Sequence, residues 1–164
     1  MSETKPTVYP ETTIIGYLAM RVSSVLRVAA NQQTTRDWWD NQRHRFELFV
    51  SRFVLDECSE GDLVAVQERL EYLERIPLLN ISEDANALAR ALLARVPLPE
   101  KAAIDALHIS VAAVNGVEYL MTWNCKHIAN PSLRSRIEQV CREMQFEPSV
   151  ICTPQELPEI DDAM

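Results

Sequence analysis

Short β-prone segments alternate along the chain with longer segments of helical spacing, and this alternation restricts the fold more than any other feature. The expected strands are residues 7–9, 46–50, 78–81, 117–122 and 149–152, and the expected helices lie within 12–18, 23–45, 53–73, 82–93, 101–114 and 131–144. Strands that are joined by helices form parallel sheets covered on both faces. We therefore expect a three-layer α/β/α fold with a parallel sheet of about five strands flanked by helices.

The chain has the size and composition of one globular domain. It contains 164 residues, of which 47% are hydrophobic and 24% are charged, and this balance is typical of ordinary globular proteins. We expect an N-terminal tail at residues 1–6, a single domain at 7–152 and an acidic C-terminal tail at 153–164.

The sequence favours a cytoplasmic protein without a membrane segment. No apolar run approaches the roughly 20 residues that span a bilayer, and residues 1–11 lack the apolar core of a secretory signal. The four cysteines form no dense framework, which indicates reduced thiols. Cys125 and His127 could begin a zinc site, but no second pair follows at ligand spacing, so ordinary packing is favoured.

The formal net charge of −8 argues against a protein that holds nucleic acid through a broad basic face. It does not exclude a nuclease, because carboxylates that bind divalent cations add to the acidity while the bound cations reverse the local field. The charge therefore leaves both enzymatic and binding functions open.

Four polar side chains interrupt apolar sequence and are the candidate functional residues: Glu11, Glu57, Asp105 and Asn124. Glu11 and Asn124 also fall at the ends of expected strands, where ligands gather in parallel sheets. Each residue has an ordinary structural alternative. Glu11 can cap a helix, Glu57 can be a solvated helix residue, Asp105 can pair with a basic residue and Asn124 can hold a turn.

In four segments the sequence resembles PIN domains, and among them the VapC-like toxins. The segments are VYPETTII (residues 8–15), SRFVLDE (51–57), DALHI (105–109) and LMTWN (120–124). Each segment alone is a weak signal, but their order and intervals, on an alternation of strands and helices, are strong together. The resemblance extends over about residues 7–152.

The resemblance implies an endoribonuclease that hydrolyses RNA phosphodiester bonds with a metal-activated water. It assigns both catalysis and metal binding to Glu11, Glu57, Asp105 and Asn124. Such oxygen ligands suit Mg²⁺ or Mn²⁺, which polarise a phosphate and lower the pKa of bound water. The family usually has aspartate at the first position and often at the fourth. Glu11 keeps the charge, whereas Asn124 removes one, which favours one tight ion over two.

Asp56 is the alternative to Glu57 for the second carboxylate, but neighbouring helical positions point about 100° apart and only Glu57 matches the family pattern. Candidate contacts with substrate or phosphate are Thr12, Thr13, His108 and Lys126, with His127 beside the last. Helix capping is the alternative for the threonines, a buried hydrogen-bonding role for His108, and a solvated loop for Lys126.

The resemblance also implies a homodimer and an antitoxin partner, as in type II toxin–antitoxin pairs. Trp38, Trp39 and the apolar spacing of residues 22–30 give weak support for a dimer through the early helices. Base stacking and core packing are alternative roles for the tryptophans. The competing functional hypothesis is a noncatalytic PIN-like binding or regulatory module, motivated by Glu11, Asn124 and the acidic charge.

Overall fold

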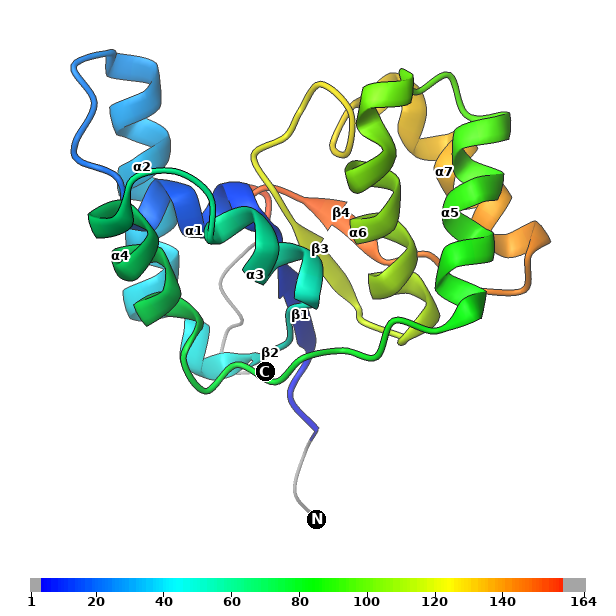
Figure 1. Ribbon diagram of the computed structural model, residues 1–164, viewed down its shortest axis with the longest axis horizontal. Coiled ribbons are helices and arrows are strands. Elements are labelled where there is room, and N and C mark those ends of the chain that lie inside the picture. The colour runs from blue at the N-terminus through cyan, green and yellow to red at the C-terminus, as the bar shows by residue number, and fades with distance from the viewer. Residues whose placement is uncertain (1–3, 158–164) are drawn as a thin grey trace.

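The computed structural model describes residues 4–157, which form a sheet with helices on both sides (Figure 1). The strands are β1 (Thr7–Pro10), β2 (Glu47–Leu48), β3 (Tyr119–Met121) and β4 (Val150–Cys152). They lie in the order β2-β1-β3-β4, and each neighbouring pair is parallel. The expected α/β fold with a parallel sheet flanked by helices is confirmed.

The sheet of the described residues has four strands, where the sequence predicts about five. Residues 78–81, the fifth expected strand, contribute a single parallel bridge between Leu78 and Val50. Hydrogen bonds run from Val50 N to Pro77 O (3.1 Å) and from Leu79 N to Val50 O (2.7 Å). Pro77 has no N–H group with which to extend the ladder, so the pairing does not lengthen into a strand.

The α-helices of the described residues are α1 (Thr12–Ala19), α2 (Leu26–Asn41), α3 (Arg52–Cys58), α4 (Leu63–Leu73), α5 (Glu83–Arg95), α6 (Ala103–Val114) and α7 (Pro131–Glu143). Two 3₁₀ turns, η1 (Arg43–Arg45) and η2 (Glu100–Ala102), precede β2 and α6. Asp62, Ser82 and Asn130 each accept a hydrogen bond from a backbone N–H of the helix that follows. Gly61 has φ +99° and separates α3 from α4, a conformation that glycine adopts without strain.

Figure 1 shows α5, α6 and α7 on one side of the strands and α1, α2 and α4 on the other. Trp38 and Trp39 of α2 belong to the core, with 4% and 9% of their surface exposed. Trp38 packs against Phe46, and Trp39 packs edge-on against Tyr72. The tryptophans are thus core residues, and they supply neither an exposed dimer face nor a platform for an RNA base.

Residues 153–157 follow β4 and pack onto the domain. Leu157 is buried, and Glu156 forms an ion pair with Arg134 of α7 at 3.4 Å. The rest of the expected C-terminal tail, residues 158–164, lies outside the described residues, as do residues 1–3 of the expected N-terminal tail. No helix within residues 4–157 combines the length and the apolar character that crossing a bilayer requires.

The carboxyl ends of β1 and β3 lie side by side. Pro10 is in register with Met121, and the backbone N–H of Glu11 donates to Met121 O at 2.9 Å. Thr122 N donates in turn to Cys152 O at the end of β4, also at 2.9 Å. The residues that follow β1 and β3 therefore meet at one edge of the sheet, the edge at which parallel sheets bind ligands.

Candidate metal centre

Glu11 follows β1 directly and precedes the first residue of α1. It is 3% exposed, and its Oε1 accepts hydrogen bonds of 2.6 Å from the hydroxyl groups of Thr13 and Thr122. Burial raises the pKa of Glu11, because the charged form loses its hydration, and the nearby His108 and the two hydroxyl groups offset only part of this effect. None of the Lys or Arg ion pairs within residues 4–157 includes Glu11.

Glu57 lies near the end of α3 and turns toward Glu11. Its Oε1 accepts a 2.6 Å hydrogen bond from the Thr12 hydroxyl and lies 2.6 Å from His108 Nε2. Burial alone would raise the pKa of Glu57, but the hydrogen bonds from His108 and Thr12 and the charge of His108 outweigh it, so the pKa is lowered. The neighbouring Asp56 is mostly exposed and pairs with Arg52 at 3.1 Å, away from this group.

His108 is fully buried on α6, and both of its ring nitrogens have partners. Nε2 faces Glu57, while Nδ1 lies 2.7 Å from the Tyr9 hydroxyl, which in turn lies 2.6 Å from Ser51 Oγ. Burial raises the pKa of Tyr9, so its hydroxyl keeps its proton at neutral pH. The chain Ser51–Tyr9–His108 therefore fixes the imidazole ring, with Nε2 directed at the carboxylate.

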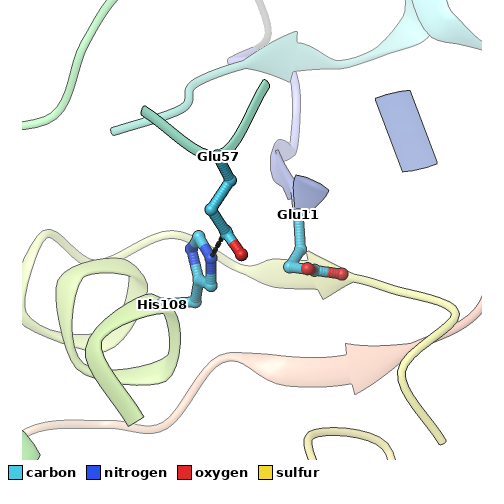
Figure 2. A group of neighbouring side chains, drawn as sticks. All are labelled: Glu11, Glu57 and His108. Atoms are coloured by element: carbon cyan, nitrogen blue, oxygen red, sulfur yellow. Dashed lines mark hydrogen bonds and ion pairs between the residues drawn. The ribbon is translucent and has the colours of Figure 1, made fainter. Parts of the chain in front are cut away.

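Glu11, Glu57 and His108 together offer a group of metal ligands. One ligand atom from each residue lies within 4.8 Å of the other two. Figure 2 shows the three side chains coming together from the end of β1, from α3 and from α6. Carboxylates suit Mg²⁺ and Mn²⁺, and an imidazole adds a donor that Mn²⁺ and later first-row ions accept. This group can hold a divalent metal ion.

Asp105 and Asn124 form a second group with His127. Asp105 lies one turn before His108 on α6 and is 9% exposed. Its Oδ1 accepts from Asn124 Nδ2 at 3.2 Å, and its Oδ2 lies 2.8 Å from His127 Nδ1. Asp105 does not belong to the group that Glu11, Glu57 and His108 form. It is hydrogen-bonded to Asn124 instead.

Thr122 links the two groups at the carboxyl end of β3. Its hydroxyl donates to Glu11 Oε1 at 2.6 Å and accepts from the backbone N–H of Asn124 at 2.9 Å. A continuous set of hydrogen bonds therefore runs from Glu11 through Thr122 to Asn124 and on to Asp105. His108, which contacts Glu57, lies one helical turn after Asp105 on α6. All four candidate residues therefore lie in one hydrogen-bonded region.

The candidate substrate contacts have different surroundings. The hydroxyl groups of Thr12 and Thr13 donate to Glu57 and Glu11, so they hold the carboxylates in this structure. Lys126 is exposed in the loop between β3 and α7, whereas His108 is fully buried. Contacts of these residues with RNA stay predictions.

Sequence reasoning did not single out Tyr9 or Thr122, and it did not place His127 against Asp105. Tyr9 carries its polar group at the end of an apolar strand, and Thr122 lies two residues before Asn124. A polar atom at the carboxyl end of a buried parallel strand is the signal that could have identified both. Nothing local in the sequence pairs His127 with Asp105.

The structure is an α/β domain with a candidate metal centre at the carboxyl edge of its sheet, and its fold is similar to that of a solved structure. The likeness is to a chain of the crystal structure of VapBC2 from Rickettsia felis bound to a DNA fragment from their promoter, with a TM-score of 0.56. The two chains are 17% identical, and the match covers 77% of this chain and 95% of that chain. No family profile matches the chain, and no curated protein matches it in sequence. At this identity the likeness supports the fold alone.

Proposed function

We propose that this chain is a metal-dependent endoribonuclease of the PIN type that acts on RNA in the cytoplasm. The observation that carries the proposal is the meeting of Glu11, Glu57 and His108, within 4.8 Å, at the carboxyl edge of a parallel sheet. The sequence resemblance to PIN domains and the structural likeness to VapBC2 favour phosphodiester hydrolysis over other metal-dependent chemistry.

In this proposal Glu11, Glu57 and Asp105 are the carboxylates that hold Mg²⁺ or Mn²⁺, with His108 beside them. When it is bound, the ion stabilises negative charge on the scissile phosphate and lowers the pKa of a water. Direct ligation by Asn124 stays a prediction. Its amide nitrogen here donates to Asp105, and its Oδ1 accepts from the backbone N–H of His127 at 3.0 Å.

The burial of Glu11 fits a cation site. A buried carboxylate whose pKa is raised, with no Lys or Arg partner among residues 4–157, is costly to ionise. A cation bound beside it removes that cost. The ligand atoms of the group and the lack of a Lys or Arg partner for Glu11 among residues 4–157 therefore both favour a cation site.

Hydroxyl groups of this chain orient the carboxylates before any ion binds. Thr12 donates to Glu57, and Thr13 and Thr122 donate to Glu11, each at 2.6 Å. Carboxylates held in this way need little rearrangement to bind an ion or to respond to charge on a phosphate. The threonines are thus positioning residues in the proposed reaction.

We further propose a toxin role, with an antitoxin protein as partner and a homodimer as the assembled form. The likeness to a chain of VapBC2 motivates the antitoxin. The segment between α1 and α2 exposes Val22 and Val25, and the first residue of α2 is the exposed Leu26; the three are 69%, 55% and 87% exposed, and a second copy could cover them. Light scattering that finds a monomer at every workable concentration would overturn the dimer.

The experiment that tests the nuclease is cleavage of defined RNAs by the purified protein with Mg²⁺, with Mn²⁺ and with EDTA. We expect internal cleavage that needs the ion and that is lost in Glu57→Gln. The matched control is Asp56→Asn, because Asp56 adjoins Glu57 in sequence but pairs with Arg52 at the surface. RNA binding without cleavage under every metal condition would favour the noncatalytic module instead.

A further inference from the structure

The carboxylate of Asp105 is held on both of its oxygens by residues of the loop that follows β3. Asn124 Nδ2 reaches Oδ1 at 3.2 Å, and His127 Nδ1 reaches Oδ2 at 2.8 Å. A carboxylate that is held by one hydrogen bond can still rotate about its Cβ–Cγ bond, whereas two bonds from different residues fix its plane. Each oxygen keeps a free lone pair for a further partner.

The loop that supplies these donors is itself anchored. Asn124 Oδ1 accepts from His127 N at 3.0 Å, and Asn124 O accepts from Ala129 N at 2.8 Å. Ile128 and Ala129 are buried, which ties the loop to the core. Because Asn124 Oδ1 accepts from a backbone N–H, the amide group must present Nδ2 to Asp105. The His127 side chain is 16% exposed, so the ring lies at the rim of the site.

We propose that His127 is a positioning residue whose Nδ1–H group orients Asp105 toward the metal ion, an assignment that rests on the proposed function. A carboxylate only accepts hydrogen bonds, so Nδ1 is the donor in this contact. Residues that hydrogen-bond a metal ligand fix its orientation, and losing one weakens metal affinity or activity about 10- to 100-fold. His127 and Asn124 act on the same carboxylate from its two sides.

Two substitutions separate the roles of the two ring nitrogens of His127. The amide nitrogen of an asparagine side chain occupies about the place of Nδ1, whereas that of a glutamine reaches about the place of Nε2. His127→Asn therefore keeps the donor to Asp105, and His127→Gln removes it. Asp105→Asn is the reference for a lost ligand. His44→Gln is the matched control, because His44 is an exposed histidine in η1.

The measurement is the dissociation constant of Mn²⁺ for the protein without RNA, by titration calorimetry or by the EPR signal of free Mn²⁺, with circular dichroism as the check on folding. We expect His127→Gln to weaken Mn²⁺ binding about 10-fold or more. His127→Asn and His44→Gln should stay near wild type. With RNA, His127→Gln should lower kcat and leave KM nearly unchanged.

Equal affinities for His127→Gln and wild type, beside a large loss in Asp105→Asn, would overturn the role of His127 and leave the proposed function standing. Equal losses in His127→Asn and His127→Gln would also overturn it, since the Nδ1 donor would then not be what matters. Unchanged Mn²⁺ affinity in Asp105→Asn would remove Asp105 from the metal site, and the failure would then lie with the proposed function.

Discussion

Two histidine–carboxylate pairs lie along α6, and they are built in opposite ways. In the first pair α6 supplies the histidine, His108, which is fully buried and lies 2.6 Å from Glu57. In the second pair α6 supplies the carboxylate, Asp105, and the partner His127 comes from a loop and lies 2.8 Å away. The first histidine is also held at its far nitrogen by Tyr9, whereas the side chain of the second is 16% exposed.

The difference in burial predicts that the two histidines contribute unequally to stability. Removing His108 would take a hydrogen-bond partner from the buried Tyr9 hydroxyl and from the partly buried Glu57 carboxylate. Removing His127 would uncover one oxygen of Asp105 near the surface. We therefore expect His108 to contribute more than His127 to the free energy of unfolding, while the carboxylates of both pairs contribute to the proposed activity.

The largest expected effect is on catalysis. Asp105→Asn removes the charge but keeps the size of the side chain, and it should lower metal-dependent RNA cleavage by more than the roughly 100-fold that marks the loss of a supporting residue. The melting temperature measured in EDTA should fall slightly, because the NH₂ group of the new asparagine faces a hydrogen-bond donor, Asn124 Nδ2 or His127 Nδ1, where a carboxylate oxygen accepted before. Full cleavage activity in the destabilised Asp105→Asn protein would contradict the prediction and favour an Asp105 that only supports the fold.

The next effect separates the two histidines by stability. His108→Ala should lower the free energy of unfolding by about 2–4 kcal/mol, because it opens a cavity in the core and removes one hydrogen-bond partner each from Tyr9 and Glu57. His127→Ala should lower it by less than about 1 kcal/mol, since the site is at the rim of the domain. Urea denaturation of the metal-free proteins measures both values. Equal losses of unfolding free energy in the two variants would show that His108 and His127 contribute equally to stability.

A smaller loss of stability is expected when His108 Nδ1, the ring nitrogen that faces Tyr9, loses its partner. Tyr9→Phe keeps the ring in the core but deletes the hydroxyl that lies between Ser51 Oγ and His108 Nδ1. We expect a loss of about 1–2 kcal/mol in the free energy of unfolding, with cleavage reduced less than in Asp105→Asn. Wild-type stability in Tyr9→Phe would mean that the chain of three residues does not hold the imidazole.

The smallest expected effect depends on pH, and it is a gain of stability where the preceding substitutions cause a loss. The pKa of Glu11 is raised above its ordinary value of 4.5, so the native state binds its proton more tightly than the unfolded chain does. The stability that this provides is present below 4.5 and is lost as the pH rises through the raised pKa. Glu11→Gln has no carboxyl group to ionise at this position, so its stability does not fall in this way. Without metal it should therefore melt above wild type at neutral pH, and the difference should shrink toward pH 4, as a calorimetric pH series can show.

Glu57 provides the counterpart to Glu11 in the same measurement. Its pKa is lowered below 4.5, so its contribution to stability is present above 4.5 and is lost as the pH falls through the lowered pKa. Glu57→Gln should thus melt below wild type at neutral pH and approach it in acid. A rise for both variants at neutral pH would show that repulsion between the carboxylates outweighs the bond from His108.

Much of the architecture could be predicted because it depends on local patterns. The alternation of apolar strands and amphipathic helices, the break at Gly61 and the cap at Ser82 all follow from neighbouring residues. The expected strand at residues 78–81 reduces to one bridge, because Pro77 cannot extend the ladder and the remaining pairing depends on the distant backbone of Val50. Local propensity cannot supply that information.

The sequence could nominate candidate residues for the site but not their arrangement. The shared ligand set of Glu11, Glu57, Asp105 and Asn124 stays a prediction, and the group of ligand atoms within 4.8 Å joins His108 to Glu11 and Glu57. The orientation of Asn124 depends on the backbone of His127, and that of His108 depends on Tyr9, 99 positions away. Such tertiary hydrogen bonds leave no pattern in a single sequence.

The pairing of β1 with β3 also determines when the site can form during synthesis. Glu11 receives its hydrogen bond from a threonine 111 positions further along, and the last donor to Asp105 is His127. Parallel neighbours need the whole intervening crossover before they can pair. A nascent chain that has emerged only as far as α5 therefore contains Glu11 and Glu57 but neither Asp105 nor the strand that aligns them. The two parts of the candidate site come together only after β3 has left the ribosome, so the site is incomplete for most of translation.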